Sequence, residues 1–467
     1  MMASPNFGIV IRNVRLPCAD HSEANSAWDI ACLGGRVQSI TSSGSCIPHE
    51  EAAVIEANGG VLVPSLCHSH IHLDKCFILG QCDPLVTGSL PEALRVTNKA
   101  KAEFPKDVNN LYARATYLIR ESVESGVTAM RAFVEVDTTV GFTCLDMGLQ
   151  LAKEWVEVCH IQIVAFAQEA LYEFADSTEP GPNYNLLCDA ASRPDVSVVG
   201  SAPWVEPDRA HALKNIELIL SLAEKHDLHA DFHLDYNLDP DAVPMVWDVL
   251  QQMRQRSWCK ISGKRVTIGH ATRLGLFSGE EWAELKRATD ILPLEIVALP
   301  QSDIYMMGRA DPSGRVPVPL AGRTINAPQV YRDHGVRVAL SVNNVENAFT
   351  PQGSLDPLTL ASLGVALFQV GTEPDWRVLL RSVSTTSKEA IGIMHGGSVS
   401  GKPADEGDGI VPRVGDPADF VVVHGARRWQ SAVLSPGFDR TTFYKGNVVA
   451  RRRAQRWNAN TGGEISN

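Results

Sequence analysis

Along the middle of the chain, short runs of apolar and β-branched residues alternate with longer stretches whose apolar positions recur at helical spacing. This alternation is typical of parallel strands joined by crossover helices. The apolar runs predict eight strands, over residues 61–74, 127–137, 161–170, 196–206, 228–235, 265–272, 291–301 and 336–344. The amphipathic stretches predict helices over residues 108–125, 209–226, 240–257 and 280–288. Eight strand–helix units in a row favour a closed (β/α)8 barrel of the TIM type over an open sheet.

The two ends of the chain depart from this alternation. Residues 7–56 and 416–450 have the pattern of short strands with turns, and we expect them to pair into one small β-sandwich. The predicted α/β architecture therefore consists of a sandwich domain, residues 1–60 and 405–467, and a barrel domain, residues 61–404. Glycine, serine, proline and aspartate in residues 396–415 predict a linker, and residues 303–324, with glycine and proline throughout, predict a loop over the barrel mouth.

Composition narrows the classes of partner. The 467 residues are 44% hydrophobic and 21% charged, enough to bury a large core. The 54 acidic and 42 basic residues give a formal net charge of -12, which argues against nucleic acid or an anionic membrane as the main partner. No apolar stretch reaches the roughly 18–20 residues of a membrane span, and the N-terminal residues lack the pattern of a secretory signal. We expect a cytoplasmic protein with a small-molecule substrate, and a homo-oligomer stays open because nothing in the sequence marks a contact surface.

Histidines follow several of the predicted strands at the end where barrels place their active sites. His70 and His72 end the first strand, and residues two apart on a strand point to the same face. His233 ends the fifth strand and His270 the sixth. One histidine at any of these places would more often be an ordinary, partly buried residue. Four at one mouth predict a metal site, because neutral imidazole is a common ligand of divalent metals.

Signatures of other chemistry are absent from the sequence. It contains no P-loop, no G-x-G-x-x-G segment, no nucleophile-elbow serine and no H-E-x-x-H segment. The ten cysteines include no C-x-x-C pair, which excludes the common thiolate zinc site and the zinc signature of cytidine deaminases.

Several segments resemble the amidohydrolase superfamily, in its branch of cytosine deaminases and triazine-ring aminohydrolases. They are residues 70–75 (HIHLDK), 164–169 (VAFAQE), 233–235 (HLD), 269–272 (GHAT) and 415–419 (GDPAD). The resemblance implies that His70, His72 and His233 bind one divalent metal, zinc or iron. It also implies that His270 orients the attacking water and that Gln168 contacts the substrate ring.

Two departures from the family pattern fall on its catalytic carboxylates. The family has glutamate three residues after the fifth-strand histidine, where this chain has Tyr236, and a metal-binding aspartate after the eighth strand, where it has Asn343. In the second strand, Phe133 stands where relatives usually have histidine. Loss of a positioned general acid or base typically costs on the order of 10²- to 10⁴-fold in rate. Ordinary ring deamination is therefore expected to be impaired.

Some of the chemistry survives these changes. Three neutral histidines suffice to hold zinc in several hydrolases and can lower the pKa of bound water to about 7. Asn343 can still offer a carbonyl oxygen to the metal, but it cannot take a proton. The alternative is that the site has lost its metal altogether. Tyr236 either acts as an acid or only shapes the pocket, and Trp204, after the fourth strand, either stacks on a substrate ring or belongs to the core.

The remaining acidic residues near the strand ends are Asp74, Glu135, Glu169 and Asp235. For Asp74, Glu169 and Asp235 we favour a supporting role, in which they orient metal ligands or accept hydrogen bonds from loop amides.

The sequence is best explained by a metal-dependent hydrolase that acts on a carbon–nitrogen bond, other than a peptide bond, of a small cyclic nitrogen-containing substrate. The bond belongs to an amine, amide or amidine group. The residues expected to assist its hydrolysis are His270, Tyr236 and Asn343. Two alternatives stay open: a barrel adapted to a lyase, isomerase or cyclase reaction, with or without metal, and a noncatalytic protein descended from an enzyme.

Overall fold

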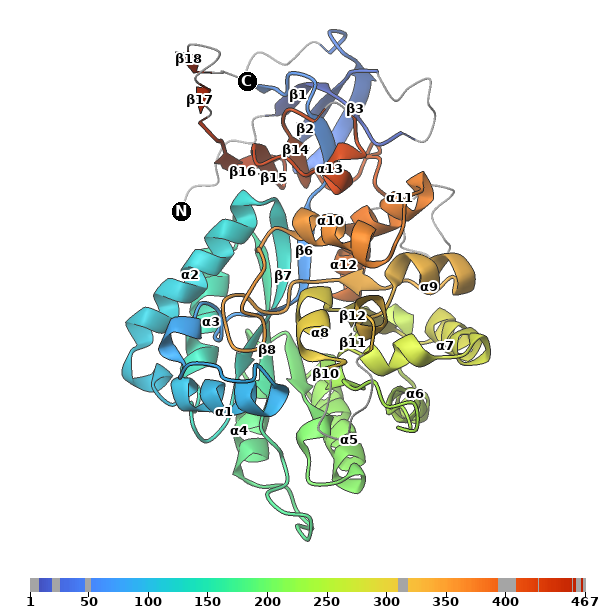
Figure 1. Cartoon of the computed structure of the whole chain (residues 1–467). Coiled ribbons are helices and arrows are strands. Elements are labelled where there is room, and N and C mark those ends of the chain that lie inside the picture. The colour runs from blue at the N-terminus through green and yellow to red at the C-terminus, as the bar shows by residue number, and fades with distance from the viewer. Residues whose placement is uncertain are drawn as a thin grey trace.

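The computed structural model describes residues 8–18, 26–46, 52–309, 318–393, 409–426, 428–455, 457–458 and 463–464. Its centre is a sheet of eight parallel strands that neighbour one another in chain order, as expected for a (β/α)8 barrel (Figure 1). The strands are β6 Leu66–His72, β7 Val127–Glu135, β8 His160–Ala167, β9 Val198–Ser201, β10 His229–Leu234, β11 Val266–His270, β12 Leu294–Ala298 and β13 Ala339–Leu340.

Helices follow each strand and surround the barrel (Figure 1). Their apolar faces and the outward side chains of the strands form one large buried cluster. The helices are α1 Leu90–Lys101, α2 Val108–Glu124, α3 Thr143–Glu154, α4 Pro182–Ala191, α5 Arg209–Lys225, α6 Val246–Gln255, α7 Gly279–Ile291, α8 Pro300–Met306, α9 Ala327–His334, α10 Pro357–Leu367, α11 Glu373–Ser382, α12 Thr385–Ala390 and α13 Ser431–Leu434.

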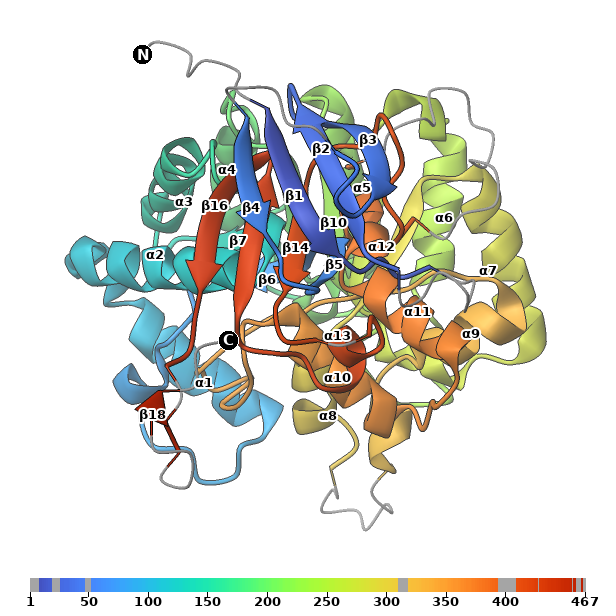
Figure 2. The ribbon, with the colours of Figure 1, turned by 90° about the horizontal axis from the view of Figure 1, so that it is seen from above.

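Two four-stranded sheets from the chain ends form the second domain, as predicted. One sheet has the order β3-β2-β1-β4 and the other β16-β15-β14-β5, and residues of both share one hydrophobic cluster. Seen from above, they lie over one another on the barrel (Figure 2). The strands are β1 Ile9–Val14, β2 Trp28–Leu33, β3 Arg36–Ser42, β4 Ala53–Glu56, β5 Val61–Pro64, β14 Phe420–Val423, β15 Arg440–Tyr444 and β16 Asn447–Arg452. A short ladder, β17 Trp457–Asn458 with β18 Gly463–Glu464, follows them.

Most strands are shorter than predicted, above all β9, which covers Val198–Ser201 of the predicted 196–206, and β13, which covers Ala339–Leu340 of the predicted 336–344. The first and seventh predicted strands differ for identifiable reasons. The predicted first strand, residues 61–74, is two strands, because β5 pairs antiparallel with β14 in the small domain and only β6 belongs to the barrel. The predicted seventh strand, residues 291–301, is shortened at both ends. Residue 291 still belongs to α7, and Pro300 starts α8, where the fixed backbone angle of proline suits the first turn of a helix.

Part of two other predicted segments lies outside the described residues. Of the linker predicted over 396–415, residues 396–408 are not described, and residues 409–415 form neither helix nor strand. Of the loop predicted over 303–324, residues 310–317 are not described, and the rest includes the end of α8 and a turn of 3-10 helix, Leu320–Arg323.

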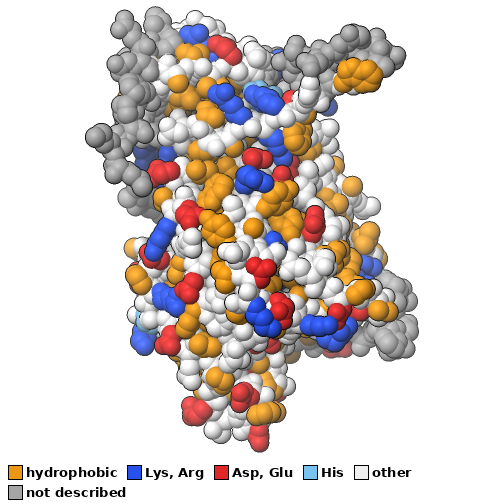
Figure 3. Space-filling model, turned by 90° about the vertical axis from the view of Figure 1, so that its left-hand side faces the viewer, with side chains coloured by type: hydrophobic (Ala, Val, Ile, Leu, Met, Phe, Trp, Pro, Cys, Tyr) orange, Lys and Arg blue, Asp and Glu red, His pale blue; other side chains and the backbone are white. Residues whose placement is uncertain are grey.

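The outer surface mixes both signs of charge. On the face drawn in Figure 3, basic and acidic side chains are interspersed among scattered hydrophobic ones. Within the described parts of the chain, no helix has the length and apolar character needed to cross a membrane.

The barrel closes between β6 and the segment after β13. Asn343 forms a parallel bridge with Ile71, in which the His72 amide donates to the Asn343 carbonyl (2.8 Å) and the Asn343 amide to the His70 carbonyl (3.1 Å). The buried hydroxyl of Ser341 accepts from the His70 amide (3.0 Å) and donates to the His70 carbonyl (2.7 Å). Barrel closure thus fixes the backbone of the two histidines of the His-x-His segment.

We predict that Ser341→Ala lowers the free energy of unfolding by about 1–3 kcal/mol, because it leaves the buried His70 amide without an acceptor. Urea unfolding followed by tryptophan fluorescence measures this change. Ser221→Ala is the matched control: its hydroxyl bonds only to the Glu217 carbonyl on the exposed side of α5, and the expected change is within about 0.5 kcal/mol. Equal stability of the two variants would contradict the role of Ser341 in closure.

Candidate active site

Three histidine side chains meet inside the barrel mouth. His70 and His72 alternate on β6 and so point the same way, and His233 approaches them from β10. The Nε2 atom of His233 lies 3.1 Å from Nε2 of His70 and 3.1 Å from Nε2 of His72. All three residues are buried, and they are the one group of three or more metal-ligating side chains found among the described residues.

The arrangement fits a divalent metal. Zinc–imidazole bonds of about 2.0–2.1 Å at tetrahedral angles place ligand nitrogens roughly 3.3–3.4 Å apart, within a few tenths of an ångström of the observed separations. The Nδ1 atoms of the three rings have no hydrogen-bond partner among the described residues. The three Nε2 atoms, by contrast, converge within a few ångströms of one another, and a shared cation explains this convergence.

Burial keeps the three rings neutral. Desolvation lowers the pKa of His70, His72 and His233 well below the ordinary histidine value, and neighbouring positive groups lower it further. For His70 a contact with the Asn343 side chain opposes this shift. Neutral imidazole is the form that binds metal, so the ligand set needs no proton loss near neutral pH.

Close packing fixes the His70 ring. The ring of Phe133, on β7, lies 4.1 Å from it between centroids and also contacts His233. On another side lies Gly269, where a Cβ atom would come within 2.7 Å of Cε1 and 2.8 Å of Nδ1 of His70. Phenylalanine and glycine here supply a close-fitting apolar wall and no further ligand.

His270, at the end of β11, is held by a carboxylate. Its Nδ1 lies 2.9 Å from Oδ1 of Asp303, whose Oδ2 accepts from the Leu299 amide and the Thr324 hydroxyl. Burial raises the pKa of Asp303, although these bonds oppose the shift. A carboxylate at Nδ1 places the proton on that nitrogen and leaves Nε2 of His270 as the acceptor.

Tyr236 and Asn343, at the two positions where the resemblance implies carboxylates, lie beside these histidines. The Tyr236 ring packs on His270 with centroids 3.9 Å apart, and burial followed by the charge of Asp303 raises its pKa well above the ordinary value. Tyr236 is therefore a hydroxyl donor near neutral pH. The Nδ2 group of Asn343 donates to the Ser302 hydroxyl (2.8 Å), so its Oδ1 is left as the acceptor end.

A cavity with about 370 Å³ of empty space, part of it open to solvent, lies beside the histidines. Every residue predicted as a metal ligand, catalytic group or substrate contact, except His70, is among those that line it. The lining comprises His72, Lys75, Leu90, Leu94, Gln168, Trp204, His233, Tyr236, His270, Asn343, Asn344 and Phe349. Trp204 lies in a short 3-10 helix, Pro203–Val205, after β9. This lining contains no aspartate or glutamate.

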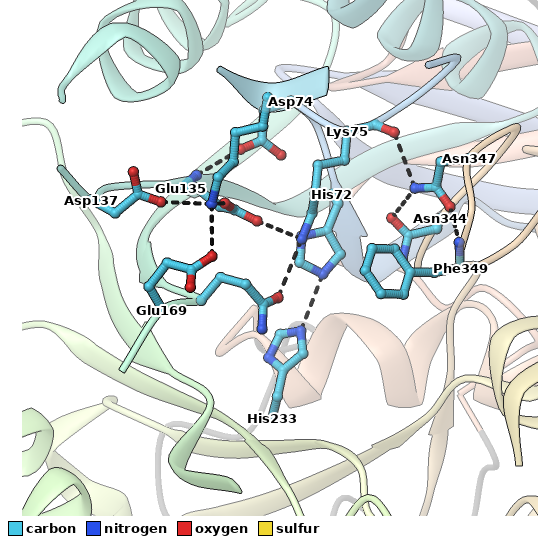
Figure 4. Close-up of polar contacts among 12 residues, drawn as sticks. His72, Asp74, Lys75, Glu135, Asp137, Glu169, His233, Asn344, Asn347 and Phe349 are labelled. Atoms are coloured by element: carbon cyan, nitrogen blue, oxygen red, sulfur yellow. Dashed lines mark hydrogen bonds and ion pairs between the residues drawn. The ribbon is translucent and has the colours of Figure 1, made fainter. Parts of the chain in front are cut away.

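Behind this wall lies a buried charge network that sequence analysis did not identify as a unit (Figure 4). Lys75 pairs with Glu135 (2.7 Å), and the other oxygen of Glu135 pairs with Lys101 (2.7 Å). Lys101 also contacts Asp137 and Glu169. Burial disfavours these charges, yet Lys101 and Lys75 lower the pKa of Glu135 to about 2, and the carboxylates raise the pKa of Lys101. Lys75 is visible in the HIHLDK segment, but only the fold brings Lys101 to it.

Of the three acidic residues for which we favoured a supporting role, Asp74 and Asp235 accept hydrogen bonds from backbone amides. Asp74 accepts from the Glu135 amide (2.7 Å), and Asp235 accepts from the amides of Met245 (2.8 Å) and Val246 (3.0 Å). Glu169 instead takes part in the charge network through Lys101.

Comparison with known proteins gives remote relatives. No protein-family model matches the chain. It is 24% identical over 400 residues to the uncharacterized protein YahJ of Escherichia coli K12, which covers 84% of this chain and 76% of YahJ. It is 22% identical over 416 residues to N-isopropylammelide isopropyl amidohydrolase of Pseudomonas sp. strain ADP, which covers 86% and 91%.

Among solved structures, 5-methylcytosine deaminase from Klebsiella pneumoniae, liganded with 5-fluorocytosine, is similar with a TM-score of 0.78. The match has 20% identity and covers 98% of this chain and 100% of that one. The fold of the whole chain, barrel and small domain together, is therefore that of this deaminase. These likenesses confirm the resemblance to the cytosine deaminase and triazine-ring branch seen in the sequence.

We predict that Gly269→Ala weakens metal binding about 10- to 100-fold, the usual range for disturbing a residue that orients a ligand, because the new methyl group displaces the His70 ring. Metal content after dialysis against a graded chelator, read by elemental mass spectrometry, measures it. In the control Gly275→Ala, the nearest atom to the new Cβ is the Thr324 carbonyl oxygen at 3.7 Å, and metal content should not change. Full metal retention in Gly269→Ala would show that metal binding does not depend on the observed position of the His70 ring.

Proposed function

We propose that this chain is a metal-dependent hydrolase of the amidohydrolase type, acting on a carbon–nitrogen bond of a small cyclic nitrogen-containing substrate. The observation that carries the proposal is the convergence of three neutral, buried imidazole nitrogens beside a cavity that opens to solvent. A divalent metal at His70, His72 and His233, zinc or iron, would act as a Lewis acid and lower the pKa of water to about 7.

His270 is the residue best placed to move protons. Asp303 holds the Nδ1 proton, so Nε2 of His270 can accept a proton from the attacking water and return it to the leaving nitrogen. This pairing supplies an acid/base group where the family's glutamate is missing. Tyr236, packed on His270 and protonated near neutral pH, is the second donor of the site.

The other lining residues position the substrate in this proposal. Gln168 and Trp204 bind the ring, and Asn343 directs its Oδ1 toward the leaving amine, from which it can accept a hydrogen bond but no proton. The named activities of the similar proteins, an isopropylammelide amidohydrolase and a 5-methylcytosine deaminase, support a nitrogen ring as the substrate class.

The direct test is metal content together with turnover. We expect about one zinc or iron per chain in protein purified without chelator, and hydrolysis of a ring substrate from a panel that includes cytosine and N-isopropylammelide. His270→Asn should keep the metal and lose about 10²- to 10⁴-fold in rate. Protein that takes up no metal, even when metal is supplied during expression, would overturn the proposal and leave the non-hydrolytic or noncatalytic alternatives.

Restoring the family carboxylates separates ordinary deamination from another reaction. We predict that Tyr236→Glu combined with Asn343→Asp gains cytosine deamination that the unaltered chain lacks, because the pair returns an acid/base group and a charged ligand. Ammonia release measures the gain, with each single variant as a control. Cytosine turnover at a normal enzymatic rate by the unaltered chain would contradict our interpretation of both positions.

A further inference from the structure

The polar groups that line the cavity have an orientation fixed by their other partners. The Lys75 ammonium donates to Oε1 of Gln168 (3.3 Å), so the end of this amide left for the cavity is Nε2, a donor. In the same way, Asn347 donates to Oδ1 of Asn344 (2.7 Å) and leaves Nδ2 of Asn344 as the remaining polar end. Nε1 of Trp204 is a further donor, and it has no partner within the described chain.

Lys75 itself is the charged group of the wall. Its side chain is 2% exposed, pairs with Glu135 and lies 5.5 Å from the centre of the Phe349 ring, which also lines the cavity. Glu135 stands behind it and shares its charge with Lys101. Figure 4 shows Lys75 between this acidic group and the pair His72 and His233.

The carboxylates nearest the cavity are already occupied. The two oxygens of Glu135 face Lys75 and Lys101, and those of Asp303 face His270 and the Leu299–Thr324 donors. No acidic side chain is among the residues that line the cavity. Where Lys75, Gln168 and Asn344 line the cavity, the described wall therefore presents donors and one cation, and no charged acceptor for an amino group.

We propose that the cavity selects anionic, oxygen-bearing rings, in which an ionised oxo group or a carboxylate is bound by Lys75 and by the amide donors of Gln168 and Asn344. This deepens the proposed function and rests on it for the reaction. Charge-assisted hydrogen bonds from a buried ammonium are stronger than neutral ones, and a ring that carries amino groups on this side would leave its own donors and those of the wall unpaired.

Two rings of equal size and opposite polarity test the proposal: barbiturate, an oxygen-bearing pyrimidine anion, and 2,4,6-triaminopyrimidine. We expect the full-length protein to bind barbiturate more tightly in isothermal titration calorimetry at neutral pH. Lys75→Met should weaken barbiturate binding about 10- to 100-fold while metal content stays unchanged.

Gln168→Glu is the sharper variant, because it keeps an oxygen for Lys75 and changes only the end that faces the cavity from donor to acceptor. It should reverse the preference in favour of triaminopyrimidine. Gln251→Glu, on the exposed side of α6, makes the same change in net charge and should leave both affinities as they were. If Lys75→Met does not fold, as judged by circular dichroism, Gln168→Glu alone decides.

An unaltered protein that prefers triaminopyrimidine, binds both rings equally or binds neither overturns the proposal, and so does an unchanged preference in Gln168→Glu. These outcomes are independent of catalysis. Selective barbiturate binding by a protein that hydrolyses no ring substrate would support the anion site and contradict the proposed reaction.

Discussion

Closure of the barrel at His70 and His72 is the constraint on which the site depends. A parallel barrel must join its first and last strands, and here the joining hydrogen bonds come from Ser341 and Asn343 to the backbone of the two histidines. The bonds that complete the sheet thus also set where two imidazoles point. His233 reaches the same place from the opposite wall, because β10 lies across the barrel from β6. The arrangement of the three histidines is in this sense a property of barrel closure.

The backbone is left-handed at three strand ends of the site. Asp235, His270 and Asn343 have φ values of 50°, 68° and 70°, a region that residues other than glycine rarely adopt. Such conformations cost of order 1–3 kcal/mol each and persist where surrounding contacts determine them. Asp235 is held by the amides of Met245 and Val246 and His270 by Asp303, so the bonds that hold the strained turns also orient the groups of the site.

The free-energy cost of burying a charge determines how the charged side chains around the cavity are paired. A buried ammonium or carboxylate is tolerated when a counter-charge lies within hydrogen-bond distance. Lys75, Glu135 and Lys101 meet this condition as a chain, and Asp303 meets it through His270. The carboxylates are thereby turned away from the cavity. The opposite end of each pairing faces the cavity, so the partners behind the wall set the polarity of the wall.

Sequence alone determined much of this protein. Alternation of apolar runs and amphipathic stretches predicted the barrel, because strand and helix periodicity is local, and His-x-His placed two ligands on one face for the same reason. It could not separate β5 from β6, since both are apolar and only pairing with β14 distinguishes them. Nor could it join Asp303 to His270, or Lys101 to Glu135, which are 33 and 34 residues apart. Such contacts depend on how distant elements pack, and so the tertiary structure alone decided which charges pair and which groups face the cavity.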